Sequence, residues 1–330
     1  MRKSISFFFL IPVISLLSHL PSTRAAEEST DLPPIPAGFE SSAAAMQAVI
    51  SGKVPVIQQP SEIPDTIVEE KGIVYCTRES KELKLDLYYP KEKKDPVPGL
   101  IFIHGGGWSG GGREIYKYYT VLFAQEGYVA ATIAYRLSGE AKFPAAVEDC
   151  KAAVRWMKAN AEKYNVDPER IAVIGGSAGG HLSMMVGYSS DVPELEGKGC
   201  NPEQSSRVQA VVNFYGPTDL TTEYARNRGE TKGFLGIDSY DENPEPFKQA
   251  SPLFHLTKDD PPTLTFQGTI DDLVPVSQAE ALHAKLDELG IPNLYDPFPG
   301  WPHTMDMAKP VSDRCVYQMK KFFAEHLGEK

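Results

Sequence analysis

The sequence lacks an excess of positive charge. Its 330 residues include 33 Lys and Arg against 44 Asp and Glu, so the formal net charge is −11 at pH 7. A surface this acidic has no general affinity for a phosphate backbone or for anionic lipid. The sequence also lacks an internal repeat, and its 42% hydrophobic and 23% charged residues exclude a disordered, collagen-like or coiled-coil chain. We therefore expect an ordinary globular protein that does not bind nucleic acid.

Long hydrophobic runs are equally scarce, and the one near the start of the chain is too short to span a membrane. It covers Ile5–Leu20 and is interrupted by proline and histidine, whereas a membrane-spanning helix needs about 20 apolar residues. Basic residues precede the run and small or polar residues follow it as far as Ala25, which is the pattern of a signal peptide. We predict that residues 1–25 are a signal peptide cleaved near Ala25, that the protein is secreted or periplasmic, and that the mature chain has no membrane span. A membrane anchor is the alternative.

Cysteine is also rare, with four residues in the whole chain: Cys76, Cys150, Cys200 and Cys315. Export would place them in an oxidising compartment, where they could form disulfides. The sequence does not choose among the possible pairings. Cys150 falls on the same helical stripe as several apolar residues, which favours a position in the core.

Metal-binding patterns are missing from the sequence. None of its seven histidines stands in an H-E-x-x-H motif or a similar arrangement of metal ligands. We expect neither a metal ion nor another cofactor.

Two regions of the chain differ in their residue pattern. Residues 26–65 are rich in Pro, Ser, Ala and Glu, apart from one possible short helix at Ala43–Ile50, and we predict a linker or a strap across the domain. In residues 66–330, short β-branched runs alternate with helical patterns, which is typical of a mostly parallel sheet wrapped by helices. We expect these residues to form the main domain, with an α/β fold of about eight strands and helices on both faces.

The expected elements follow from these patterns. Eight stretches have the pattern of a strand: Gly72–Cys76, Lys84–Tyr89, Leu100–His104, Val129–Tyr135, Ile171–Ile174, Ala210–Phe214, Thr263–Gln267 and Leu294–Pro297. Five longer stretches have the pattern of a helix: Glu114–Glu126, Pro144–Tyr164, Ala178–Ser189, Gln278–Leu289 and Ser312–Leu327. The first two strands alternate between apolar and polar residues, as in an antiparallel hairpin at a sheet edge. Two helices carry start signals: Pro144 as a first helical residue, and Ser277 with Glu280 as a capping box.

The stretch from Asp219 to Ala250 interrupts the alternation with Gly, Pro and many charged residues. Such an excursion commonly overhangs the carboxyl ends of the strands, where ligands bind. Its planar and hydrogen-bonding side chains include Tyr224, Arg226, Arg228 and Tyr240. These groups suit a sugar, so the excursion is a candidate for shaping the site; a solvated loop is the alternative.

A G-x-S-x-G motif at Gly175–Gly179 lies between a buried strand and a helix. A serine at such a sharp strand-to-helix turn projects its hydroxyl above the sheet, and glycines flank it because a Cβ would clash there. The helix that follows directs its N-terminal N–H groups at the place where an oxyanion forms. We interpret Ser177 as a nucleophile. A Gly-rich phosphate turn or a plain tight turn is the alternative.

A second glycine-rich turn, Gly105–Gly107, follows another buried strand. Acyl transfer develops negative charge on a carbonyl oxygen, which needs preorganised hydrogen-bond donors. Successive glycines allow backbone N–H groups to turn toward that oxygen. We predict an oxyanion hole formed by the N–H groups of Gly106, Gly107 and Ala178; a flexible loop is the alternative.

An acid and a base follow the serine in the chain order that this architecture requires. Asp271 lies in the loop after one predicted strand, and His303 lies in the loop after the next. Ser177, Asp271 and His303 would therefore meet at the carboxyl ends of parallel strands. Asp272 is the competing carboxylate, and its spacing from the strand does not exclude it.

The other histidines have separate expected roles. His104 and His181 flank the two glycine turns, and we expect them to brace those turns. His255 lies in a loop and is the rival base. His283 and His326 lie within predicted helices, where we expect solvated positions.

The chain resembles α/β-hydrolase esterases of the broad group that includes hormone-sensitive lipase and bacterial feruloyl or acetyl esterases. The stretches that carry the resemblance are His104–Trp108, Tyr135–Leu137, Phe143–Asp149, Gly175–His181, Tyr215–Leu220, the Asp271 loop and His303. Gly176 before the nucleophile and Trp108 after the glycine run place the chain nearer to the feruloyl-esterase-like (BD-FAE-like) branch.

This resemblance implies an α/β-hydrolase fold and a secreted serine hydrolase for carboxylic esters that works through a Ser-His-Asp triad and an acyl-enzyme. The implied substrates are small-molecule or carbohydrate esters, in particular short acyl or feruloyl esters of carbohydrates, and no cofactor is implied. The family pattern of Asp, two residues and Val-Pro assigns Asp271 rather than Asp272 as the triad acid. A peptidase like prolyl oligopeptidase and a non-catalytic binding protein with the hydrolase fold are the alternatives.

Overall fold

The computed structural model describes residues 31–92 and 95–328. Residues 33–330 group as one compact unit, so most of the segment predicted as a linker or strap belongs to the same unit as the sheet. The predicted signal peptide, residues 1–25, lies outside the described residues.

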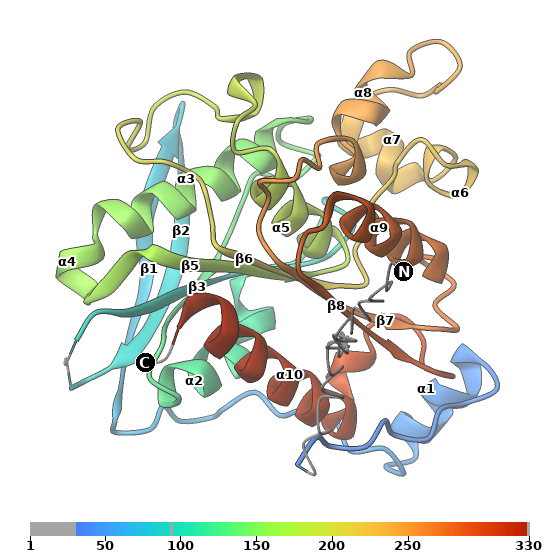
Figure 1. Ribbon diagram of the computed structural model, residues 1–330, viewed down its shortest axis with the longest axis horizontal. Helices are drawn as coiled ribbons and strands as arrows, with labels where there is room; N and C mark the ends of the chain where they lie inside the picture. Colours follow the sequence, from blue (N-terminus) through green and yellow to red (C-terminus); the bar gives the residue numbers. More distant parts are fainter. Residues whose placement is uncertain (1–30, 93–94, 329–330) are drawn as a thin grey trace, which may run out of the picture. The chain divides into compact units, whose positions relative to one another are not determined.

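A sheet of eight strands forms the centre of this unit, in the order β1-β2-β4-β3-β5-β6-β7-β8 (Figure 1). The strands are β1 (Ile67–Arg78), β2 (Lys81–Pro90), β3 (Val97–Ile103), β4 (Val129–Ile133), β5 (Val166–Gly176), β6 (Ala210–Phe214), β7 (Thr263–Gly268) and β8 (Asn293–Phe298). All eight predicted strands are present, and the predicted α/β class is confirmed.

The directions of the strands determine at which side of the sheet the loops begin. β1 and β2 form the predicted antiparallel hairpin at the edge, and β2 also runs antiparallel to β4. From β4 across to β8, neighbouring strands are parallel. The carboxyl ends of these strands therefore meet at one side of the sheet. The loops that contain Gly105, Ser177, Asp271 and His303 all begin there.

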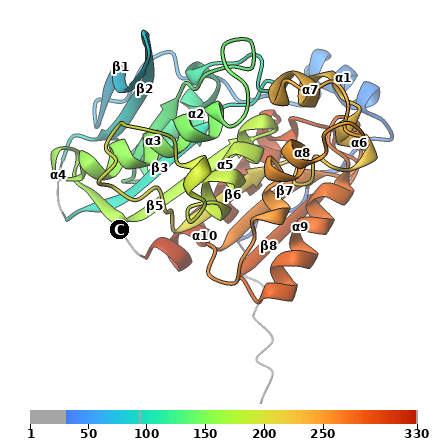
Figure 2. The same cartoon turned by 90° about the horizontal axis from the view of Figure 1, so that it is seen from above.

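Helices cover both faces of the sheet. In the described residues they are α1 (Ser42–Ile50), α2 (Lys117–Gln125), α3 (Ala145–Ala159), α4 (Ala161–Tyr164), α5 (Ala178–Tyr188), α6 (Glu223–Arg226), α7 (Gly229–Leu235), α8 (Glu245–Gln249), α9 (Val276–Leu289) and α10 (Lys309–Leu327). Figure 1 shows α3, α5 and α9 over one face and α2 and α10 over the other. Viewed from above, α6, α7 and α8 lie together at the end of the sheet where α1 also lies (Figure 2). Within residues 31–92 and 95–328, no helix combines the length and apolar character needed to cross a bilayer.

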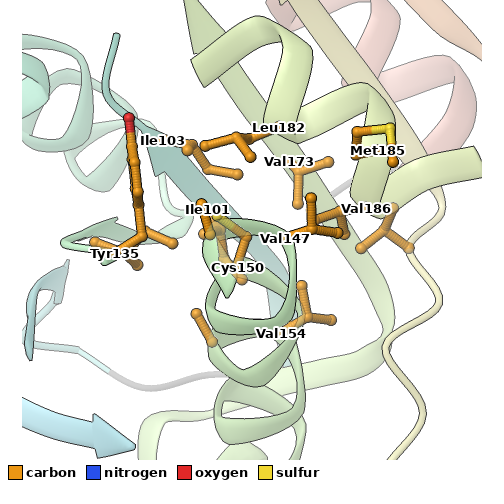
Figure 3. Packing of buried hydrophobic residues seen from close by; sticks show 14 of the residues in the cluster. Ile101, Ile103, Tyr135, Val147, Cys150, Val154, Val173, Leu182, Met185 and Val186 are labelled. Atoms are coloured by element: carbon orange, nitrogen blue, oxygen red, sulfur yellow. The ribbon is translucent and has the colours of Figure 1, made fainter. Parts of the chain in front are cut away.

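The core consists of two layers because side chains alternate along each strand. On β3, Ile101 and Ile103 pack into the layer beneath α3 and α5, whereas Leu100 and Phe102 pack into the layer beneath α2 and α10. Cys150 is fully buried on α3 and packs in the first of these layers, as predicted (Figure 3).

Two predicted helix starts are wrong in detail. α3 begins at Ala145, one residue after Pro144. The capping box at Ser277 does not form: α9 begins at Val276, and the residue before it, Pro275, makes no side-chain cap. Pro275 has the extended ψ of 145° that ends the preceding loop, so Ser277 is already inside the first turn and cannot act as the cap.

Residues 33–57 run along the loop that joins β8 to α10. The Phe39 N–H donates to the Gly300 carbonyl (2.7 Å), at the start of this loop. The Ile57 N–H donates to the Met307 carbonyl (2.9 Å), near its end. The N-terminal segment is therefore hydrogen-bonded to both ends of the loop that contains the candidate base.

A disulfide and a buried carboxylate attach the edge hairpin to the body of the domain. Cys76 on β1 is bonded to Cys200, which lies 124 residues further along the chain. Two residues after Cys76, Arg78 Nε donates to Asp149 Oδ1 (3.2 Å) on α3. The Asp149 carboxylate is fully buried and also accepts from Arg136 Nε and Nη2, each at 2.8 Å. Removing one partner of such a cluster would leave a buried charge uncompensated.

We predict that replacing Cys76 and Cys200 together by serine lowers the free energy of unfolding by about 2–4 kcal/mol, because the open chain gains conformational freedom when it unfolds. Denaturant unfolding of the oxidised protein and of the double variant measures this difference. A thiol reductant should shift the midpoint of the wild-type protein and leave that of the variant in place. Equal midpoints for the oxidised protein and the variant would contradict the prediction.

Candidate active site

Ser177 is the single residue between β5 and α5, and the chain reverses there. Its backbone angles are φ 56° and ψ −122°, a sparsely populated region for a residue with a side chain, which costs on the order of 1–3 kcal/mol. The Ser177 N–H donates to the Phe214 carbonyl (2.8 Å) at the end of β6, which holds the turn in place. The serine is half-buried at the carboxyl side of the sheet, in the predicted position.

The glycines of the motif are required by close backbone contacts. A Cβ on Gly179 would lie 1.9 Å from the Ile103 carbonyl oxygen, and a Cβ on Gly175 would lie 2.3 Å from the Gly179 carbonyl oxygen. No side chain fits at either distance. The first turn of α5 can therefore approach the end of β3 only because these positions are glycine.

The second glycine turn presents backbone donors beside Ser177. Gly106 (φ 116°) and Gly107 (φ 58°) have positive φ angles, which a residue with a side chain rarely adopts. In residues 31–92 and 95–328, no protein acceptor is hydrogen-bonded to the N–H of Gly106, Gly107 or Ala178. All three residues border cavities that Ser177 also lines. Three N–H donors are thus free to bind an anionic oxygen near the serine.

Two buried histidines brace the glycine turns, as predicted. Trp108 Nε1 donates to His181 Nδ1 (3.2 Å), and His181 Nε2 donates to the Ala250 carbonyl (2.7 Å). Burial lowers the pKa of His181 to about 4, so its ring is neutral and can both donate and accept. His104 Nδ1 donates to the Gly105 carbonyl (2.8 Å), and burial lowers its pKa as well.

The structure brings Asp271 and His303 together. His303 Nδ1 donates to Asp271 Oδ2 over 2.6 Å, and the aspartate side chain is fully buried. The same carboxylate accepts from Gln267 Nε2 (3.2 Å) and from the N–H groups of Leu273 (2.9 Å) and Val274 (2.8 Å). These donors fix the carboxylate and therefore the orientation of the imidazole. Gln267 was not identified from the sequence, because a buried glutamine at a strand end carries no motif.

Asp272 and His255, the rival candidates for the acid and the base, do not occupy these positions. Asp272 is exposed. His255 Nε2 donates to a carbonyl at the end of α8 (2.7 Å), whereas His303 lines two cavities together with Ser177. The prediction of a solvated position for His283 is wrong: its side chain is buried, and its ring stacks on Tyr295, because that face of α9 packs against β8.

Ser177 and His303 line a cavity of about 310 Å³ on the α2 side of the turn. Its walls include the rings of Tyr116, Tyr119 and Tyr215, and we call it the tyrosine cavity. The glycine turn, Gly105–Gly107, also lines this cavity. An ester carbonyl placed there could therefore reach both the serine and the backbone donors.

The same two residues line a smaller cavity of about 130 Å³ beneath the excursion, which we call the arginine cavity. The excursion contributes four residues to it: Tyr224, Arg228, Glu230 and Thr231. Of the four side chains singled out from the sequence, Tyr224 and Arg228 therefore border the site. Arg226 instead stacks over the ring of Tyr240 (5.2 Å), and neither of these two residues lines the arginine cavity.

A buried carboxyl group near His303 was not predicted. The ring of Tyr215 lies 4.5 Å from the imidazole of His303, and the Tyr215 hydroxyl donates to Asp306 Oδ1. Burial raises the pKa of Asp306, and burial together with the charge of Asp306 raises the pKa of Tyr215, which keeps the phenol protonated as a donor. Tyr215 stands in the stretch that carries the family resemblance, but Asp306 has no signal in the sequence.

Comparison with known proteins identifies the family. The BD-FAE family model matches residues 85–286, more than half of the chain. The chain belongs to the BD-FAE family. It is thus an α/β-hydrolase of the esterase group that its motifs indicated. The match with the family model ends before His303 and does not include the N-terminal segment.

Relatives of this BD-FAE protein are esterases. Esterase LipC of Mycobacterium tuberculosis is 34% identical over 231 residues, which are 68% of this chain and 57% of the relative. The chain spans about half the length of the curated relatives it matches. A truncated carbohydrate esterase from gut microbiota is 29% identical with a TM-score of 0.71, over 82% of this chain and 100% of that one. A thermophilic esterase of the planctomycete Thermogutta terrifontis is 28% identical with a TM-score of 0.69, over 83% of this chain and 96% of that one.

We predict that Asp271→Asn weakens the hydrogen bond at His303 Nδ1, whereas the neighbouring Asp272→Asn leaves it intact. An amide in place of the carboxylate removes the charge that this N–H faces. Proton NMR of the wild-type protein should show a strongly deshielded imidazole N–H signal that disappears in the first variant. Loss of the signal in Asp272→Asn instead would assign the acid to the other aspartate.

Proposed function

We propose that the protein is a secreted serine hydrolase that cleaves carboxylic esters of carbohydrates by way of an acyl-enzyme. The observation that carries the proposal is the arrangement of Ser177 and His303 on shared cavities, with Asp271 bound to the far nitrogen of the imidazole. In this proposal Ser177 is the nucleophile, His303 the base and Asp271 the orienting acid.

The first half of the reaction forms the acyl-enzyme. His303 Nε2 takes the hydroxyl proton of Ser177 while the serine Oγ bonds to the ester carbonyl carbon. The tetrahedral intermediate then collapses: the bond between that carbon and the alcohol oxygen breaks, and His303 gives its proton to the leaving alcohol. Asp271 stabilises the imidazolium that exists between these two transfers, and its four hydrogen bonds hold the ring in the required tautomer.

The second half releases the acid and restores the serine. A water molecule gives a proton to His303 and attacks the acyl carbon, after which the Ser177 oxygen leaves with that proton. In both halves the carbonyl oxygen carries negative charge. The N–H groups of Gly106, Gly107 and Ala178 are the donors that we assign to it, which is the proposed oxyanion hole.

The arginine cavity supports a carbohydrate as the alcohol part of the ester. Arg228 and Glu230 supply a donor and an acceptor, and the guanidinium of Arg228 lies 5.7 Å from the ring of Tyr224. A sugar offers hydroxyl groups to such a pair and an apolar ring face to an aromatic side chain. The similarity to a carbohydrate esterase from gut microbiota favours the same substrate class.

The disulfide supports export. Cys76 and Cys200 are bonded, and structural disulfides persist in oxidising compartments rather than in a reducing cytosol. Together with the signal-peptide pattern in residues 1–25, this bond supports a secreted or periplasmic location.

We predict that Ser177→Ala folds normally and loses activity by several powers of ten in kcat, because the remaining residues cannot form the acyl-enzyme. Hydrolysis of p-nitrophenyl acetate by the purified variant measures the loss, and an unchanged unfolding midpoint excludes a folding defect. Comparable turnover by the variant and the wild-type protein would refute the assignment of the nucleophile.

We predict that Arg228→Ala lowers kcat/KM on acetylated xylan by about tenfold more than on p-nitrophenyl acetate, since one polar contact to the sugar is worth about 1.4 kcal/mol. Arg226→Ala is the matched control: this arginine lies in the same excursion and also stacks on a tyrosine, but it does not line the arginine cavity. Equal losses on both substrates would argue against a sugar in this cavity.

A further inference from the structure

A third cavity extends the site toward the N-terminal segment. It has a volume of about 350 Å³ and lies between α1 and the loop that contains His303, and we call it the α1 groove. Met46 and Val49 line it from α1. Leu273 and Met307 line both the α1 groove and the tyrosine cavity, as does His303. The two cavities are therefore neighbours that share one wall.

α1 is attached to the domain beside the groove. Its N-terminus is capped by Ser41, whose Oγ accepts from the Ala44 N–H (3.2 Å). Ser42 Oγ donates to the Ile270 carbonyl (3.3 Å), two residues after the end of β7. Ala45 is buried, so the helix lies close to its support.

Large apolar side chains on the shared wall and on α1 are exposed. Met46 is 60% exposed, Leu273 45% and Met307 40%. A cluster of such side chains beside a catalytic serine is typical of a surface that a ligand covers. Asp272 also lines the groove, and its charge disfavours a ligand that ends in a carboxylate.

We infer that the α1 groove binds the distal part of the acyl group of the ester. This inference rests on the proposed esterase function and names the acyl class: a neutral alkyl or aryl acyl group long enough to pass Leu273 and Met307. The polar arginine cavity suits the sugar alcohol, whereas the apolar wall and the α1 groove suit the acyl chain, since burying methylene groups away from water is favourable. The specificity-determining residue is Met46, which lies outside the part of the chain that the family model matches.

Met46→Glu tests the inference, with Ile50→Glu as the matched control. Ile50 lies on the same helix, is 72% exposed and does not line the groove. On p-nitrophenyl octanoate we expect kcat/KM of Met46→Glu to fall by about tenfold, because a charge enters the apolar path. On p-nitrophenyl acetate, which is too short to reach α1, it should stay unchanged. Ile50→Glu should alter neither value, and Met46→Leu should keep the wild-type ratio.

Methyl ferulate distinguishes the two acyl chemistries. A parallel loss on ferulate in Met46→Glu indicates that the groove also accepts an aryl acyl group, and a loss on octanoate alone restricts it to alkyl chains. Either result supports the groove as an acyl site. An unchanged ratio of octanoate to acetate activity in Met46→Glu overturns it while leaving the esterase proposal intact.

Binding without turnover separates the two proposals further. In the Ser177→Ala background, calorimetric titration with methyl octanoate should show weaker binding when Met46→Glu is added and no change when Ile50→Glu is added. Equal affinity in all three proteins refutes the groove even if the wild-type protein hydrolyses no ester. Absence of hydrolysis with a retained difference in affinity refutes only the proposed esterase function.

Discussion

The contact between the end of β3 and the first turn of α5 is the constraint on which the site depends. Gly179 approaches the Ile103 carbonyl so closely that no Cβ fits between them. This contact forces the reversal at Ser177 and places the glycine turn after β3 beside the serine. The candidate nucleophile and the backbone donors therefore occupy one place for a single steric reason, and the strain at Ser177 is maintained by the sheet around it.

The histidines differ in the groups to which their rings are hydrogen-bonded. His104 and His181 are buried, their pKa values are lowered by burial, and they donate to backbone carbonyls as neutral rings. Among the described residues, His303 is the histidine whose ring is hydrogen-bonded to a carboxylate, and that carboxylate is saturated with donors. Burial alone makes a histidine a structural brace, whereas a fixed carboxylate allows it to carry a positive charge during a reaction.

Two segments that leave the sheet complete the rim around Ser177. The excursion contributes charged and aromatic side chains at the arginine cavity, and the N-terminal segment contributes α1 and is hydrogen-bonded on each side of the His303 loop. The central sheet positions the candidate triad, whereas these two segments line the neighbouring cavities. The arginine cavity is polar and the α1 groove is apolar, and the roles proposed for them rest on this difference.

The sequence by itself predicted the sheet and the candidate triad, because each of those features has a local cause. Period-two and β-branched runs specified all eight strands, and glycines at fixed spacing specified the turn at Ser177. Tertiary structure alone decided which cysteines pair, that Gln267 donates to Asp271, that Tyr215 donates to Asp306, and that α1 lines a cavity with His303. These features join residues that are far apart in the chain. The sequence around a buried polar group or an exposed methionine does not indicate which distant residue it contacts. Two local signals for helix starts failed. α3 begins one residue after Pro144, and α9 begins at Val276, two residues before the predicted Gln278, because Pro275 sets its start.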